Sequence, residues 1–176
     1  LWDLNKKEII LYQYVLHGAV YGTTYFKIHP DELIDPYSGE VFPKLVVIDP
    51  EIIRIKTHPQ DMNNVIEYRI EYKCLEERDG RSVEVAHREI TRRAETDVVD
   101  EYAEQSKTWI IEEWEQVGGA PWQLVLFVPW EYDFPPIIHQ KNLPSLKSCY
   151  GDSDIDDVIN VQDKSNFVVS NTGKII

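Results

Sequence analysis

Apolar residues recur at helical spacing near the start of the chain, over residues 6–21. Asn5 is followed three residues later by Glu8, which is the sequence form of a capping box at a helix N-terminus. Gly22 is the residue type that most often ends a helix. We therefore expect an opening helix over residues 6–21, capped by Asn5. Its apolar positions are Ile9, Tyr12, Leu16 and Ala19 or Val20.

The next segments have the composition of β-strands. β-Branched and aromatic side chains over residues 23–29 predict a strand that ends at the Pro-Asp turn of residues 30–31. Residues 42–49 and 52–57 predict two more strands. The Asp-Pro dipeptide at residues 49–50 separates them, because proline lacks the N–H group that a central sheet ladder needs.

The clearest local pattern surrounds the dipeptide Asp79-Gly80. Residues 65–75 and 82–91 each alternate apolar and polar side chains, and an Asp-Gly pair is preferred in the tight turn of a hairpin. The pattern predicts a long antiparallel β-hairpin.

The segment over residues 95–115 is strongly acidic, with eight Asp and Glu residues against one lysine, so its acidic face must stay solvated or meet cations. Its alternation favours strands, although a helix over residues 96–105 also fits, and both interpretations stay open. Residues 123–128 predict an apolar strand. Residues 134–143 contain prolines that exclude a regular helix and predict an extended segment.

A closing helix is predicted to start near Ser153, where several Asp residues would stabilise the helix N-terminus, and to run to about residue 171. Ile155, Val158 and Ile159 give this helix an apolar start. We therefore expect an α+β fold, with an N-terminal helix, an antiparallel β-rich middle that contains the long hairpin, and a C-terminal helix packed on the sheet.

Further along the closing helix, the same face carries polar side chains. Gln162, Asn166 and Ser170 follow one another at intervals of four residues. Buried amides need hydrogen-bond partners, so these three are candidate subunit-interface residues that meet another subunit or another part of a longer chain. Simple exposure to solvent explains the pattern as well, since Asp163 and Lys164 lie in the same helix.

Composition limits the classes of function. The 176 residues suit a single domain, 1–176, and because the chain begins with Leu1 we expect it to be a piece of a longer protein. Lys and Arg number 18 against 31 Asp and Glu, a formal net charge of −13, which disfavours tight binding to the phosphates of nucleic acid. Polar residues and glycines interrupt the uncharged stretch over residues 9–26, so no membrane span is predicted.

No catalytic residue, cofactor or metal site is predicted. The five histidines lack metal-binding spacing, and Cys74 and Cys149 are far apart and outside any C-x-x-C motif. Neither a nucleophile elbow nor a phosphate-binding glycine motif occurs. The acidic residues from Asp152 onward begin a calcium-loop pattern, but Asp157 occupies the position that requires glycine, so an acidic helix N-terminus explains them better.

The aromatic residues leave an alternative function open, a stand-alone β-rich module that binds carbohydrate or peptide. Cross-strand packing explains aromatic residues at strand positions without any ligand. A hydrolase is a third hypothesis that no residue spacing supports. The candidate groove residues of the binding module are Trp109, Trp114, Trp122 and Trp130.

Four segments, in this order, resemble the portal proteins of tailed bacteriophages and related prophages, in the branch found in long-tailed phages of Gram-positive bacteria. Residues 14–28 (YVLHGAVYGTTYFKI) resemble the family's opening helix and following strand, and residues 47–53 (VIDPEII) resemble its Asp-Pro-Glu turn. Residues 134–144 (FPPIIHQKNLP) and 150–171 (YGDSDIDDVINVQDKSNFVVSN) are similar to its Pro-Pro stretch and its Ser-Asp helix. Their shared order carries the resemblance.

The resemblance implies that the chain corresponds to much of the outer wing of a portal protein, with stem and clip regions downstream. Such proteins form a dodecameric ring at one capsid vertex, which receives the packaging motor, passes double-stranded DNA and joins the head to the tail. The implied partners are further copies of the chain, the terminase, capsid and head-tail connector proteins, and DNA in transit. The implied location is the virion, after assembly in the host cytoplasm, and the ATPase is the separate terminase.

Overall fold

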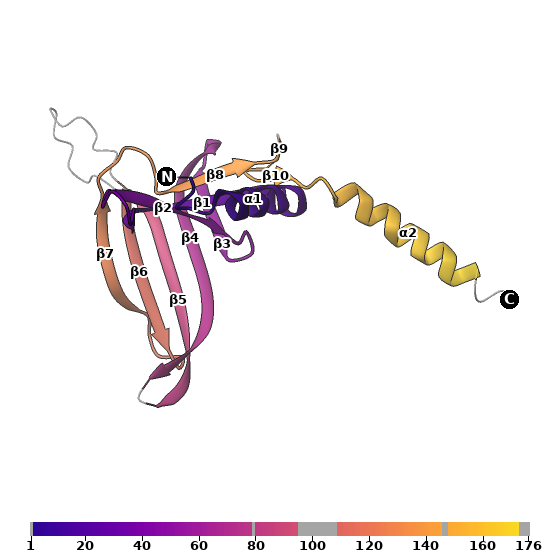
Figure 1. The fold of residues 1–176 in the computed structure, drawn as a ribbon. Helices are drawn as coiled ribbons and strands as arrows, with labels where there is room; N and C mark the ends of the chain where they lie inside the picture. Colours follow the sequence, from indigo (N-terminus) through magenta and orange to yellow (C-terminus); the bar gives the residue numbers. More distant parts are fainter. Residues whose placement is uncertain (1, 79, 95–108, 146–147, 173–176) are drawn as a thin grey trace.

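The computed structural model describes residues 2–78, 80–94, 109–145 and 148–172 and confirms the α+β architecture (Figure 1). A helix precedes antiparallel strands, and a second helix follows them. Neither helix in this part of the chain is long and apolar enough to span a bilayer. The elements are α1 (Lys7–Tyr21), β1 (Thr23–Ile34), β2 (Val41–Ile48), β3 (Ile53–His58), β4 (Asp61–Arg78), β5 (Arg81–Arg93), β6 (Trp109–Val117), β7 (Gln123–Trp130), β8 (Ile137–Lys141), β9 (Leu143–Pro144), β10 (Gly151–Asp152) and α2 (Asp156–Thr172).

Helix α1 forms as predicted, but its predicted cap is wrong. Lys6 has a left-handed backbone conformation (φ 53°) directly before the helix, and among the described residues no side-chain cap bond is made at this N-cap position. Asn5 instead binds β2, where its Nδ2 donates to the Pro43 carbonyl (3.1 Å) and its Oδ1 accepts from the Leu45 N–H (2.7 Å). Lys6, not Asn5, occupies the N-cap position, and the Asn5 side chain serves the contact with β2. Gly22 ends the helix as predicted, with a φ of 73°.

The three-stranded sheet has the order β2-β1-β8, and β1 continues past its predicted end to Ile34. Among the described strands, β8 pairs with β1 only as far as Lys27, so Pro30 lies where β1 has β2 alone as a neighbour. Proline is tolerated there because its missing N–H group is not needed for a second ladder. The pairing with β2 also shifts register after His29, which interrupts the ladder there. The predicted turn at residues 30–31 is therefore wrong.

The five-stranded sheet has the order β3-β4-β5-β6-β7 and contains the predicted hairpin. Strands β4 and β5 pair without interruption from Glu67 opposite Arg92 to Arg78 opposite Arg81. Gly80 takes a φ of 71° in the turn, a conformation that glycine adopts without strain. The hairpin is confirmed, and its strands are longer than the alternating segments that predicted it.

The acidic segment is confirmed as a strand in its second part, where it forms β6. Residues 95–108, which include the alternative helix over residues 96–105, lie outside the described residues. Strands β2, β3 and β7 agree with their predictions, and β8 and β9 show the extended structure predicted for residues 134–143.

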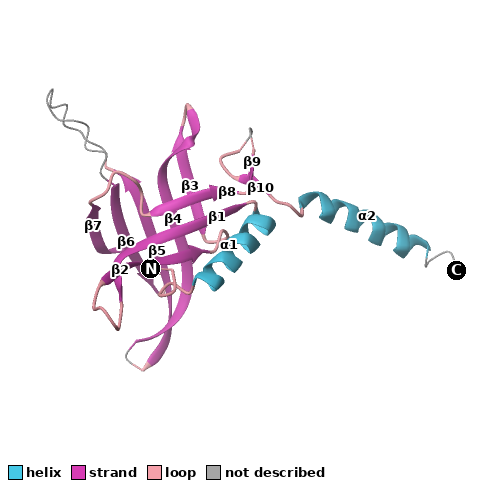
Figure 2. Cartoon of the chain, turned by 45° about the horizontal axis from the view of Figure 1, so that its top comes forward, coloured by secondary structure: helices cyan, strands magenta, loops and turns pink. Residues whose placement is uncertain are grey.

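The hydrophobic core lies between the two sheets, where β1, β2 and β8 cross the long strands (Figure 2). An ion pair between Lys27 on β1 and Glu89 on β5 also joins the sheets. The turn end of the β4–β5 hairpin extends beyond the small sheet (Figure 1). The buried cluster is Tyr25, Ile48 and Ile137 from the small sheet with Ile53, Tyr68, Ile70, Trp109 and Trp130 from the large one.

The predicted packing of the C-terminal helix on the sheet is wrong. Helix α2 has no buried residue and extends away from both sheets (Figure 1). Its apolar start is exposed, with exposed fractions of 38% for Ile155 and 59% for Val158. The prediction failed because an apolar start at helical spacing does not indicate what, if anything, covers it.

Candidate assembly surfaces

Helix α2 is held at its start. The Asp154 N–H and the Ser153 hydroxyl both donate to the Ala19 carbonyl near the end of α1, at 3.0 and 2.8 Å. Ser153 also accepts from the Ile155 N–H (3.2 Å), and Asn142 donates to the Asp154 carboxylate (2.8 Å). Ser153 thus closes a turn just before the helix, close to its predicted capping role. These bonds fix the point at which α2 leaves the body of the protein.

The predicted interface residues Gln162, Asn166 and Ser170 all lie on α2 and are exposed. Gln162 Nε2 donates to Asn166 Oδ1 (3.0 Å), so the structure brings these two amides together. Ser170 follows one turn later on the same side of the helix. Gln162, Asn166 and Ser170 thus form a polar stripe that is exposed to solvent and free to meet a partner. That the stripe contacts another subunit stays a prediction.

The stripe belongs to a wider part of α2 that carries no charge. With about 100° per residue, the stripe and three aliphatic residues fall within about 120° of the helix circumference. Asp156, Asp157, Asp163 and Lys164 all lie outside this arc. Exposed aliphatic residues beside amides are typical of helix interfaces, where amides set register. We call this surface the uncharged face, and it consists of Val158, Ile159, Gln162, Asn166, Val169 and Ser170.

Helix α1 also presents an apolar surface to solvent. Only Ile10 and Gly18 of this helix are buried. Positions predicted from the helical spacing point outward, with exposed fractions of 55% for Ile9 and 68% for Tyr12. Beside the helix, a groove of about 350 Å³ runs over the outer side of the small sheet. We call it the α1 groove, and its apolar lining is Trp2, Leu11, Tyr14, Phe26, Leu45 and Ile138.

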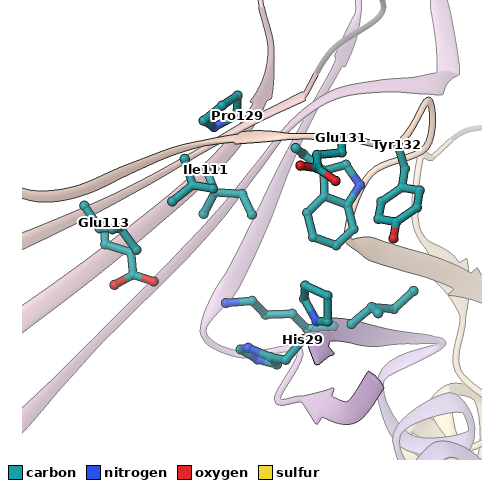
Figure 3. A pocket seen from close by; sticks show the side chains of 12 residues that line it. His29, Ile111, Glu113, Pro129, Glu131 and Tyr132 are labelled. Atoms are coloured by element: carbon teal, nitrogen blue, oxygen red, sulfur yellow. The ribbon is translucent and has the colours of Figure 1, made fainter. Parts of the chain in front are cut away.

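A separate cleft of about 340 Å³ opens between β1 and strands β6 and β7. Figure 3 shows His29 across the cleft from Ile111, with Glu113 and Tyr132 to either side. Burial and the nearby Lys27 charge lower the pKa of His29, which favours the neutral imidazole. Aromatic, imidazole and carboxylate side chains thus line this cleft.

The four tryptophans of the alternative function do not line one groove. Trp109 and Trp130 pair across β6 and β7 and are buried in the core. Trp114 lies an odd number of residues from Trp109 and faces the opposite side of the sheet. Trp114 pairs there with Arg88, which also packs over the Trp122 ring at 4.0 Å. Packing within the sheet therefore accounts for these tryptophans.

Sequence spacing missed one cluster on the inner face of the hairpin. Cys74 and Glu76 on β4 and His87 on β5 place their sulfur, oxygen and nitrogen atoms within 4.8 Å of one another. The strand register of the predicted hairpin could have revealed this cluster. A two-residue Asp-Gly turn places Tyr72 opposite His87, which makes Cys74 the diagonal cross-strand neighbour of His87. Hydrogen bonds from Arg78 and His87 lower the pKa of Glu76. Both cysteines are free thiols.

Comparison with known proteins does not assign the chain to a family. No protein-family model matches it, and no curated protein matches its sequence.

Proposed function

We propose that this chain is the outer wing of a portal-like ring protein at the capsid vertex of a phage or prophage, through which double-stranded DNA is packaged and ejected. Helix α2 carries the proposal, because it has 17 residues, an uncharged face and no buried side chain. A helix of this kind is stable in proteins mainly when its apolar side packs on a partner. The order of the four family-like segments supports the choice of family.

A closed ring needs two different surfaces on each subunit that fit one another. The chain offers the uncharged face of α2 and the α1 groove with its exposed neighbours Ile9 and Tyr12. Helix α2 projects about 25 Å from its attachment point, at about 1.5 Å per residue, while the groove stays on the body. In the proposed ring, α2 of each subunit packs against the α1 groove of the next. The terminase, capsid and connector proteins then bind the assembled ring.

Two neighbouring valines test this arrangement. Val169 lies on the uncharged face of α2 and Val168 lies off it, and both are exposed, at 71% and 62%. In the full-length gene product that contains this chain, V169D should abolish ring particles in negative-stain electron microscopy, because a desolvated carboxylate at an interface is strongly unfavourable. V168D introduces the same charge one residue away and should leave the rings intact.

Three outcomes separate the hypotheses. Annular particles that V169D alone removes would support the ring and its α2 contact. Rings that both variants keep would support the ring but remove α2 from its interface. Single particles at every concentration, together with binding on a glycan or peptide array, would replace the portal proposal with the binding module.

A further inference from the structure

We propose that Cys74, Glu76 and His87 form a binding site for a divalent transition-metal ion, with Zn²⁺ as the best fit. The Cys74 Sγ lies 3.7 Å from Glu76 Oε1, and His87 Nε2 lies 2.9 Å from the same oxygen. All three atoms lie within 4.8 Å of one another. Tetrahedral Zn²⁺ separates such ligand atoms by roughly 3.3 to 3.6 Å, so side-chain shifts of about 1 Å complete the geometry.

The hairpin holds the three ligands on one rigid surface. Cys74 and Glu76 are two residues apart on β4 and therefore project from the same face. His87 projects from that face of β5, opposite Tyr72. The pairing of β4 with β5 is continuous through this region, so the backbone positions of the ligands are fixed before any ion binds. This site is independent of the proposed ring contacts.

Neighbouring side chains orient the ligands. The Tyr72 ring stacks on His87 with centroids 5.0 Å apart. Glu115 Oε1 lies 3.6 Å from His87 Nδ1, just beyond hydrogen-bond distance, so a shift of a few tenths of an ångström lets Glu115 accept from Nδ1–H and direct Nε2 toward the cluster, as carboxylates do in many histidine-metal sites. Arg78 donates to Glu76 Oε2 (2.8 Å) and to Glu115 Oε2 (3.0 Å), so Glu76 Oε1 stays directed at Cys74 and His87.

The charges of the cluster match a divalent ion. Before ion binding Cys74 is a thiol, because burial and the neighbouring Glu76 raise its pKa, so a bound ion must displace the thiol proton. With the thiolate formed, Cys74, Glu76 and Glu115 supply three negative charges, and Arg78 supplies one positive charge. The net charge of these four groups is then −2, which a divalent cation neutralises. This favours binding of a doubly charged cation over a singly charged one. The thiolate and imidazole ligands favour Zn²⁺ over Mg²⁺ or Ca²⁺, which prefer oxygen.

The site is open on one side. The side chains of His87 and Glu76 are 20% and 33% exposed, so an ion can enter from solvent. Tyr72, His87 and Glu115 also line a cavity of about 250 Å³ that reaches Lys27 and His29 on β1. Three protein ligands leave the fourth tetrahedral position to water or to a small anion, as in open zinc sites.

Titration of the reduced chain with Co²⁺ tests the site, because Co²⁺ substitutes for Zn²⁺ and a thiolate ligand gives a near-ultraviolet charge-transfer band. We expect a band that saturates at one ion per chain and disappears on addition of Zn²⁺. C74S should remove the band, and H87Q should weaken Co²⁺ binding by at least about tenfold. C149S removes the other free cysteine and should bind as the unsubstituted chain does.

Several results would overturn the proposal. The first is the absence of a charge-transfer band at millimolar Co²⁺. The second is a band that disappears in C149S but remains in C74S, and the third is saturation at one ion per two chains. Circular dichroism of each variant checks its fold. If C74S does not fold, E115Q gives a second test, since loss of this orienting carboxylate should weaken Co²⁺ binding about 10- to 100-fold without removing a ligand. Unchanged affinity in E115Q and H87Q would also refute the site.

Discussion

The ion pair between Lys27 and Glu89 joins the two sheets in a nearly closed environment, and its removal gives a quantitative test of the fold. The two side chains are only 13% and 14% exposed. Glu89 Oε1 is buried without a hydrogen-bond partner among the described residues, so Lys27 is the main compensation for this carboxylate. K27M removes the charge and keeps much of the side-chain volume. An uncompensated buried charge typically destabilises a protein by about 3 to 5 kcal/mol.

Residual exposure lets water reach Glu89, so we expect K27M to lose about 3 kcal/mol, the lower end of that range. The double variant K27M/E89L replaces both charges with apolar groups and should recover to within about 1 kcal/mol of the unsubstituted protein. Lys73 and Glu84 form an exposed pair on the same large sheet, 67% and 61% exposed. K73M should therefore change stability by no more than about 0.5 kcal/mol.

Urea unfolding followed by tryptophan fluorescence measures these differences, because Trp109 and Trp130 are buried in the core between the sheets. An unchanged m-value would show that the variants unfold over the same surface as the parent protein. The reasoning fails if K27M loses less than about 1 kcal/mol, or if the double variant is as unstable as K27M. The first result would mean that water already solvates Glu89 in the folded protein, and the second would mean that K27M loses packing and not charge compensation.

Two further predictions concern the close contact of Gly151 and the buried imidazole of His139. A Cβ on Gly151 would lie 2.2 Å from the Gly22 carbonyl oxygen, so G151A should lower the free energy of unfolding, measured by urea titration, by about 3 kcal/mol. The control G39A lies at φ 73° with no atom within 4 Å of its Cβ and should lower it by about 1 kcal/mol. Equal losses in the two variants would contradict the close contact at Gly151. Burial, with a smaller effect of Lys141, lowers the pKa of His139 to about 4 from 6.5. Between pH 6.5 and 4 the His139 imidazole is therefore protonated in the unfolded chain but still neutral in the folded protein. The free energy of unfolding should fall by about 1 to 2 kcal/mol as the pH drops through this range, after allowance for solvent screening. NMR titration checks this, and a His139 pKa of 6 or above would disprove it.

Most of the secondary structure followed from local patterns because each signal acts over a few residues. The alternation on both sides of Asp79-Gly80 predicted the hairpin, and Gly22 predicted the end of α1. The errors arose where distant residues decided the outcome. Asn5 fits a local cap, yet its partners on β2 are about forty positions away in sequence, at Pro43 and Leu45. Spacing along the chain cannot reveal such a competition.

The surfaces were harder to predict than the strands because amphipathic spacing does not say what covers an apolar face. Ile9, Tyr12 and Leu16 have the spacing of a buried helix face, and all three are exposed. The same uncertainty affected α2, whose apolar start suggested packing on the sheet. The Cys74 and His87 cluster needed the pairing of two strands, which a search for ligand spacing within one segment cannot supply.

The distribution of charge in the large sheet bears on how this chain would meet DNA. Arg69, Arg88 and Arg92 each pair with a glutamate of the same sheet, so these guanidinium groups already have anionic partners. A phosphate would have to displace a carboxylate from each pair, and the net charge of −13 would oppose its approach. Counterion release from Lys and Arg contacts supplies most non-specific affinity for DNA. If this chain forms part of a ring around a moving duplex, strong DNA contacts must therefore come from other regions of the ring.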